Sequence, residues 1–136
     1  KAVAKLTYAY ANATVPKVTV MLDKAYGTAY TVMCSKAIGA DVVFAWPKSV
    51  IGTMDPEMAV KIMYEEEIAA AGDKLAYIND KKAEYTEALS GALSAARRGY
   101  VDDIIEPDAT RKRVIAAFEM LYSKDEMRPY KKHSTI

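Results

Sequence analysis

The sequence contains few of the residues from which a function is usually recognised. Its 136 residues include one cysteine, one histidine, six glycines and five prolines. A single cysteine cannot form an internal disulfide, and so little glycine and proline excludes a collagen-like or low-complexity chain. Nineteen basic and eighteen acidic residues leave a net charge of +1, without the basic excess typical of nucleic-acid binders. No apolar run approaches the roughly 20 residues of a membrane span. These absences predict a soluble, cytoplasmic domain that neither binds nucleic acid nor inserts into a membrane.

The order of the predicted elements indicates an α/β fold. Apolar residues make up 51% of the chain, enough for a core, and 136 residues fit one domain. β-Branched runs alternate with helical spacings, which favours helices packed on a largely parallel sheet. Asp55 followed by Pro56 predicts a helix start, and Gly39 predicts a helix end. We expect strands at 18–22, 42–46 and 49–54 and an extended segment at 100–105. We expect helices before residue 14, at 29–37, at 56–68 and from Pro107 onward. The stretch 69–98 should also be helical, with breaks near Gly72 and Gly91.

The first residues already show a helical pattern. Val3, Leu6 and Tyr10 fall at helical spacing, and no capping residue precedes them. Because natural chains rarely begin inside a helix, we expect the N-terminus to be a cut, with some partners of this helix missing.

Side chains that usually perform catalysis are scarce. His133 lies in a basic tail, where a solvated side chain is the simplest interpretation, and no His/Cys cluster suggests a metal site. Cys34 falls on a predicted helix without a nearby histidine, so we expect a small buried residue and not a nucleophile. Asp102 and Asp103 are adjacent on an extended segment and should point to opposite faces, which favours a solvated turn over acid/base work.

One local pattern could carry chemistry through the backbone. The turn at Tyr26, Gly27 and Thr28 joins the strand at 18–22 to a helix, and the first N–H groups of a helix lack intrahelical acceptors. Such amides can hold the oxygen of a carbonyl as it becomes an enolate or oxyanion. Gly27 would allow close approach of a ligand to the backbone. A purely structural glycine is the alternative, because every α/β connection has a similar turn.

Several segments, in order, resemble the carboxyltransferase subunits of biotin-dependent enzymes, namely acyl-CoA carboxylase β-type subunits and the related methylmalonyl-CoA and glutaconyl-CoA decarboxylase subunits. The resemblance extends over essentially the whole chain. Its segments are 13–20 (ATVPKVTV), 24–30 (KAYGTAY), 33–36 (MCSK), 39–47 (GADVVFAWP), 96–107 (ARRGYVDDIIEP) and 128–133 (RPYKKH).

The resemblance implies a crotonase-type fold, in which ββα units repeat in a superhelix and a full-length subunit has two such domains. It places residues 1–136 in the C-terminal part of the second domain, as a fragment of a longer subunit. Members of the family transfer a carboxyl group between carboxybiotin, held by a partner, and an acyl-CoA. Their active site lies between the first domain of one subunit and the second domain of another, and backbone amides stabilise the enolate-like oxygen.

By position in the motif, the family's second-domain amide pair corresponds to Thr28 and Ala29, with Gly27 permitting the approach of the ligand. Thr31 corresponds to a residue that lines the acyl pocket, and Tyr30 belongs to the same substrate-binding surface. No metal is implied. Thr28 stands where relatives commonly have a second glycine; its N–H survives that change, but the β-branched side chain narrows the pocket.

A second departure lies at Asp55 and Met58, where relatives usually have glycines. Asp55 makes a better helix cap than glycine. Met58 either alters a helix start that faces biotin or substrate, as in a decarboxylase-like or divergent subgroup, or repacks a buried helix.

The resemblance also implies partners. These are a biotin carboxyl carrier protein or domain, an acyl-CoA, and further copies of the subunit in a dimer-based oligomer, a hexamer for the full-length subunit. The alternative function is a catalytically inactive oligomerisation fragment, for which seven methionines and ten tyrosines would suit adaptable contact surfaces. A nucleic-acid surface at 111–113 and 131–132 is the weakest hypothesis, because acidic residues at 106, 108, 119 and 126 balance the charge.

Overall fold

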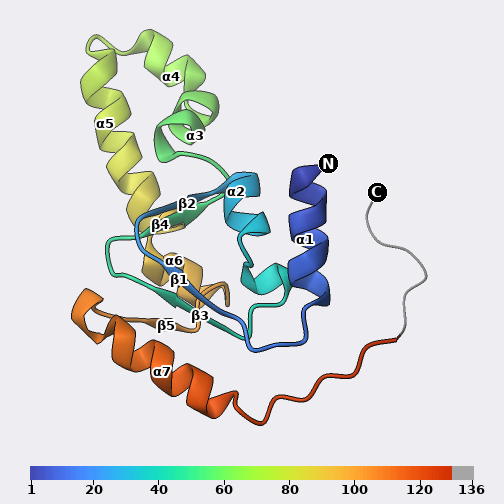
Figure 1. Ribbon diagram of the computed structural model, residues 1–136. Helices are drawn as coiled ribbons and strands as arrows, with labels where there is room; N and C mark the ends of the chain where they lie inside the picture. Colours follow the sequence, from blue (N-terminus) through green and yellow to red (C-terminus); the bar gives the residue numbers. More distant parts are fainter. Residues whose placement is uncertain (130–136) are drawn as a thin grey trace.

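The computed structural model describes residues 1–129 (Figure 1). Its α-helices are α1 (Ala2–Asn12), α2 (Gly27–Val32), α3 (Pro56–Met63), α4 (Glu65–Ala70), α5 (Lys74–Tyr85), α6 (Ala92–Arg97) and α7 (Thr110–Met120). Its strands are β1 (Val18–Met21), β2 (Lys24–Tyr26), β3 (Val42–Ala45), β4 (Val50–Gly52) and β5 (Asp103–Ile104). Short 3₁₀ turns cover Lys36–Ile38 and Pro107–Ala109, and a π-helical segment covers Thr86–Ser90. No helix within this part of the chain is long and apolar enough to cross a membrane.

The strands form two small parallel sheets, as the alternation of strands and helices predicts. One sheet has the order β1-β3-β5, and the other pairs β2 with β4, placing Tyr26 opposite Gly52. Helices cover these sheets, with α6 behind the two-stranded sheet and α7 along the three-stranded one (Figure 1).

Strand β3 lies at the centre of the core because both of its faces are buried. Val43 and Ala45, each fully buried, belong to the larger apolar cluster, which includes residues of β1, β4 and α6. Phe44, which points to the opposite face, packs with Ile105 and with Ala117 of α7. A parallel strand covered on both sides reads as a continuous apolar run, which explains why this strand was predictable.

Helices α3, α4 and α5 extend away from the sheets as a helical arm, residues 56–85 (Figure 1). Side-chain caps begin two of its three helices: the Asp55 carboxylate accepts the Glu57 N–H at 2.9 Å in α3, and the Asp73 carboxylate accepts two N–H groups of α5 at 3.1 Å each. No residue of α4 or α5 is buried. The predicted helix at 56–68 is interrupted at Tyr64, whose φ of −121° separates α3 from α4.

Two predictions near α2 are wrong. Strand β2 was not expected, because its three residues carry no apolar alternation. The helix expected at 29–37 ends at Val32, since Cys34 takes a left-handed conformation with φ +61° and residues 36–38 form a separate 3₁₀ turn. The Thr19 hydroxyl donates to the Cys34 carbonyl at 2.7 Å and fixes this break from a neighbouring strand. Gly39, which was predicted to end that helix, instead ends the 3₁₀ turn, with φ +111°.

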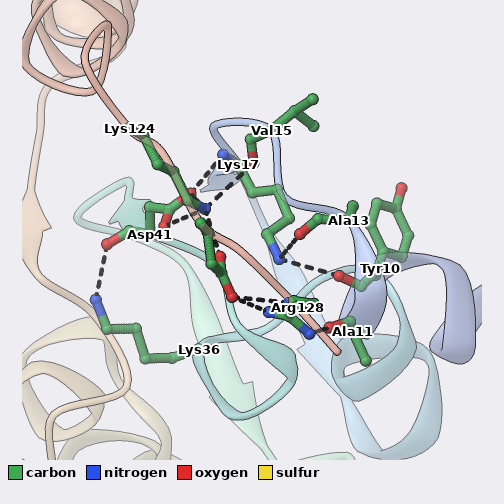
Figure 2. A network of polar contacts seen from close by, with 10 residues as sticks. Tyr10, Ala11, Ala13, Val15, Lys17, Lys36, Asp41, Lys124 and Arg128 are labelled. Atoms are coloured by element: carbon green, nitrogen blue, oxygen red, sulfur yellow. Dashed lines mark hydrogen bonds and ion pairs between the residues drawn. The ribbon is translucent and has the colours of Figure 1, made fainter. Parts of the chain in front are cut away.

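A polar network joins the segment after α7 to the start of β1 (Figure 2). The Asp41 carboxylate accepts the Lys17 N–H at 2.7 Å and the Lys124 ammonium at 2.8 and 2.9 Å. The buried Lys17 ammonium donates to the carbonyls of Tyr10 and Ala13 at 3.0 Å each, which satisfies the C-terminal end of α1. Burial alone would raise the pKa of Asp41, but hydrogen bonds and positive charges from Lys124 and Lys17 hold it below the usual value.

Candidate functional site

The turn between β2 and α2 is held tightly against the end of β4. Gly27 has φ +53°, and a Cβ built there would lie 2.9 Å from the Thr53 carbonyl oxygen. A side chain at this position would therefore be strained and would collide with backbone. The requirement for glycine is set by packing within the chain, and so the structural interpretation of Gly27 holds, whatever ligand the turn accepts.

The same turn presents donor groups to the surface. Helix α2 starts at Gly27, so its first N–H groups lack intrahelical acceptors, and its cap residue Tyr26 provides no side-chain hydrogen bond. Thr28 and Ala29 are exposed. The two residues selected from the sequence therefore lie at an exposed helix start, where amides without intrahelical acceptors can hold a carbonyl oxygen.

The predicted site residues lie beside two hollows. A cavity of about 550 Å³ is lined by Gly27, Tyr30 and Thr31, together with residues of β4 and α6. A larger groove of about 850 Å³ follows β1 and β2 and is lined by Ala29 and again by Tyr30. Thr28 lines neither hollow and lies on the exposed turn between its neighbours. The structure therefore brings the five predicted residues onto one turn and helix, with Tyr30 common to both hollows.

The Thr31 side chain makes a hydrogen bond within the chain, and Tyr30 is partly buried. The Thr31 hydroxyl donates to the Gly27 carbonyl at 3.1 Å, which leaves its oxygen as an acceptor. Burial, and then the neighbouring Tyr100, raise the pKa of Tyr30 above its usual value. Both side chains therefore present neutral groups to the cavity at physiological pH.

Sequence reasoning missed the far wall of the 550 Å³ cavity. Arg98, Tyr85, Tyr100 and the buried Ser35 also line this cavity. Arg98 and Tyr100 belong to the segment 96–107 that supported the resemblance, but nothing in their local pattern assigned them a role. Only the packing of α6 and the π-helical segment against β4 brings them to this cavity.

The departures at Asp55 and Met58 have different consequences. Asp55 caps α3 as predicted, and burial, followed by the Asp55 and Asp23 charges, raises the pKa of the nearby Tyr26. Met58 is 55% exposed, on a helix that buries Pro56, Ala59 and Val60. That its helix start faces biotin or substrate stays a prediction.

Cys34, Asp102 and Asp103 are the other side chains that the sequence analysis considered for chemistry. Cys34 is buried as predicted, and burial is the chief reason that its pKa is raised, which disfavours a thiolate nucleophile. Asp102 is exposed, as the predicted solvated turn requires, and its carboxylate also accepts from the Lys36 ammonium at 2.7 Å and from the Val43 N–H at 2.8 Å. Asp103 faces Arg113 instead, at 3.9 Å, so the two carboxylates do point apart.

His133 and the lysines at 131 and 132 lie outside the described residues. Across residues 1–129, no group of three or more His, Cys, Asp or Glu side chains could hold a metal ion.

The whole chain is similar to known carboxyltransferase proteins. Residues 1–136 match the carboxyl transferase domain. The chain is 51% identical, over 98% of its length, to methylmalonyl-CoA decarboxylase subunit alpha of Propionigenium modestum, and 51% identical to the carboxyltransferase subunit of propionyl-CoA carboxylase from Haloferax mediterranei. In both cases it spans 26% of the relative, about a quarter of its length.

A solved structure agrees with these relatives. The chain matches the crystal structure of the transcarboxylase 12S hexamer with methylmalonyl-coenzyme A and methylmalonic acid bound, with a TM-score of 0.90 and 46% identity. The match covers 98% of this chain and 26% of that one. It confirms the predicted crotonase-like α/β fold.

Proposed function

This chain belongs to the carboxyl transferase domain family, and on that basis we propose that it supplies part of a site that transfers a carboxyl group between carboxybiotin and an acyl-CoA. The observation that carries the proposal is the start of α2, where Thr28 and Ala29 are exposed and their neighbours Gly27, Tyr30 and Thr31 line a cavity.

In this mechanism the chain acts through its backbone. The Thr28 and Ala29 N–H groups donate hydrogen bonds to a ligand oxygen that gains negative charge, and the positive end of α2 favours that charge. Gly27 fixes the turn that aims these amides. Tyr30 and Thr31 shape the adjoining wall and limit the size of the group that enters. Transfer of this kind needs no charged acid or base from the chain.

The ligands implied by the family fit these residues. A biotin ureido group and an acyl thioester both present a carbonyl oxygen, which is an acceptor, and the exposed amides at the start of α2 are donors. Biotin, carried by a carrier protein or domain, supplies the carboxyl group when bound. The acyl groups to test first are propionyl and methylmalonyl, which are named for relatives of this chain.

The proposed context is a longer subunit. Residues 1–136 form the C-terminal part of its second domain, and the site is completed by another domain of a cytoplasmic homo-oligomer. Support comes from the chain spanning about a quarter of its relatives and from the hexamer formed by the transcarboxylase 12S relative. On this proposal the chain alone is inactive.

The test replaces one amide in the full-length subunit. Thr28→Pro removes the N–H, and we expect carboxyl transfer to fall about 100- to 1000-fold, the usual cost of losing one oxyanion donor. Transfer is measured from carboxybiotin to propionyl-CoA, and assembly is checked by light scattering. Thr28→Gly is the matched control: it retains the N–H and should transfer at close to the original rate. Undiminished turnover in an assembled Thr28→Pro enzyme would show that the amide assignment is wrong.

Exposed apolar side chains favour a second candidate, an oligomerisation module without chemistry of its own. Met58, Ile62 and Leu75 on the helical arm are between 55% and 75% exposed, as expected of surfaces that contact another chain. Light scattering on this chain separates the candidates, because a monodisperse oligomer without transfer activity supports the module and a clean monomer argues against it.

A further inference from the structure

The 550 Å³ cavity between α2 and α6 has an unusual charge pattern. Arg98 is the one charged residue that lines it, and no acidic side chain does. Within residues 1–129 the Arg98 guanidinium makes no ion pair or side-chain hydrogen bond, unlike Lys36, Lys124 and Arg128. A cation that lacks a protein counter-ion at the wall of a cavity is suited to an anionic ligand.

Other features of the cavity indicate a small organic ligand. Its volume lies within the range of about 300–1000 Å³ that is usual for ligand pockets. Tyr30, Tyr85 and Tyr100 contribute aromatic surface for an apolar body. Ser35, which also lines the cavity, is 1% exposed, and its hydroxyl has no hydrogen-bond partner in the part of the chain described. A buried hydroxyl without a partner is costly unless a ligand or water satisfies it.

We propose that this cavity is a subsite for a carboxylate attached to a small apolar body, with Arg98 as its counter-ion. The planar guanidinium binds a carboxylate through two parallel hydrogen bonds, whereas a single cation is a poor match for the several charges of a nucleotide phosphate. The identity of the carboxylate rests on the proposed function: it is the group being transferred. Two molecules can present it, a carboxylated acyl-CoA and the carboxylated urea ring of biotin.

The experiment uses the full-length subunit and compares Arg98→Gln with Arg97→Gln. Arg97 is the matched control, since it is the exposed neighbouring arginine at the end of α6 and does not line the cavity. The first measurement is the binding of methylmalonyl-CoA and of propionyl-CoA by calorimetry. The second measurement is the KM for a carboxylated biotin carrier domain.

We expect Arg98→Gln to weaken the binding of one carboxylated ligand about 10- to 100-fold, while the affinity for propionyl-CoA, which lacks the carboxylate, changes by less than about twofold. Arg98→Lys should recover part of the loss, because it restores the charge without the paired hydrogen bonds. Weaker binding of methylmalonyl-CoA in the first measurement assigns the carboxylate to the acyl-CoA, and a higher KM in the second assigns it to the carrier.

Other outcomes overturn the subsite. Equally weakened binding of methylmalonyl-CoA and propionyl-CoA would mean that Arg98 contacts the coenzyme or supports the fold. No change in either measurement would mean that Arg98 contacts neither ligand. Failure of the proposed function is distinguishable: an unmodified subunit that binds methylmalonyl-CoA in an Arg98-dependent way but transfers no carboxyl group retains the subsite and loses the activity.

Discussion

The sheets with α6 and α7 form a body that keeps its shape by burial, whereas the helical arm keeps its shape by local signals. In the body, Val43, Ala45 and Ile51 are almost completely buried between elements distant in sequence. In the arm, α4 and α5 bury no residue, and α5 has the Asp73 cap and the short-range ion pair Lys81–Glu84. The buried residues of the arm are Pro56, Ala59 and Val60 of α3, a helix that contacts α4 and α5.

This difference bears on where function resides. The turn that carries the candidate amides belongs to the body, where Gly27 packs against Thr53 and positions the start of α2 rigidly. The arm instead presents exposed apolar side chains on helices that need little from the rest of the chain. Rigid elements hold chemical groups more accurately than peripheral ones, so chemistry in the body and contacts on the arm are the expected division.

The largest expected effect compares two apolar truncations. Val43→Ala in the body should lower the free energy of unfolding by roughly 2–3 kcal/mol, because it leaves a cavity in a fully packed core. Leu75→Ala in the arm should change it by less than about 0.5 kcal/mol, because Leu75 is 75% exposed. Chemical denaturation of both variants measures the difference, and similar losses would mean that the arm is packed like the body.

The next effect concerns the polar network around Asp41, which belongs to the body. Lys124→Gln should destabilise the protein by about 1–2 kcal/mol at pH 7, because it removes an ammonium that donates two hydrogen bonds to a half-buried carboxylate. The pKa of Asp41 is below its unfolded value, so its stabilising contribution is present above that unfolded value and is lost as the pH falls through the folded one.

The destabilisation by Lys124→Gln should therefore shrink below about pH 4. Unfolding measured at pH 7 and at pH 3 tests this, with Lys112→Gln on the exposed face of α7 as the control. A destabilisation of equal size at both pH values would contradict the role given to the Asp41 carboxylate.

The smallest effect lies in the arm. Asp73→Ala removes the side chain that accepts the N–H groups of Leu75 and Ala76, and it should cost α5 about 1 kcal/mol. Hydrogen exchange should show faster exchange in α5 while the amides of β3 stay unchanged, because the arm is held locally. Asp80→Ala, farther along the same helix, should leave the exchange rates as they are. Loss of protection in β3 as well would show that arm and body unfold together.

Prediction from the sequence succeeded where neighbours along the chain decide the structure. Asp55 with Pro56 predicted the start of α3, because capping involves residues only a few positions apart. The continuous apolar run at Val42–Ala45 identified a strand buried on both faces. The roles assigned to the amides of Thr28 and Ala29 rest on the family motif and stay a prediction.

Prediction failed where a distant residue decides. The helix expected through Cys34 is broken by a hydrogen bond from Thr19, and the ion pair of the exposed Asp102 with Lys36 was not predicted. In both cases the partner lies far along the chain, so no local pattern marks the contact.

The sequence by itself therefore determined the α/β alternation apart from β2, the cap of α3, the glycine turn and the family, since these depend on short-range hydrogen bonds and on motifs read in order. The tertiary structure alone decided that Arg98 and Tyr85 share a cavity with Tyr30 and Thr31. Those residues meet only after α6 and the π-helical segment have packed against β4, and that placement is set by burial of apolar surface, which does not depend on distance along the chain.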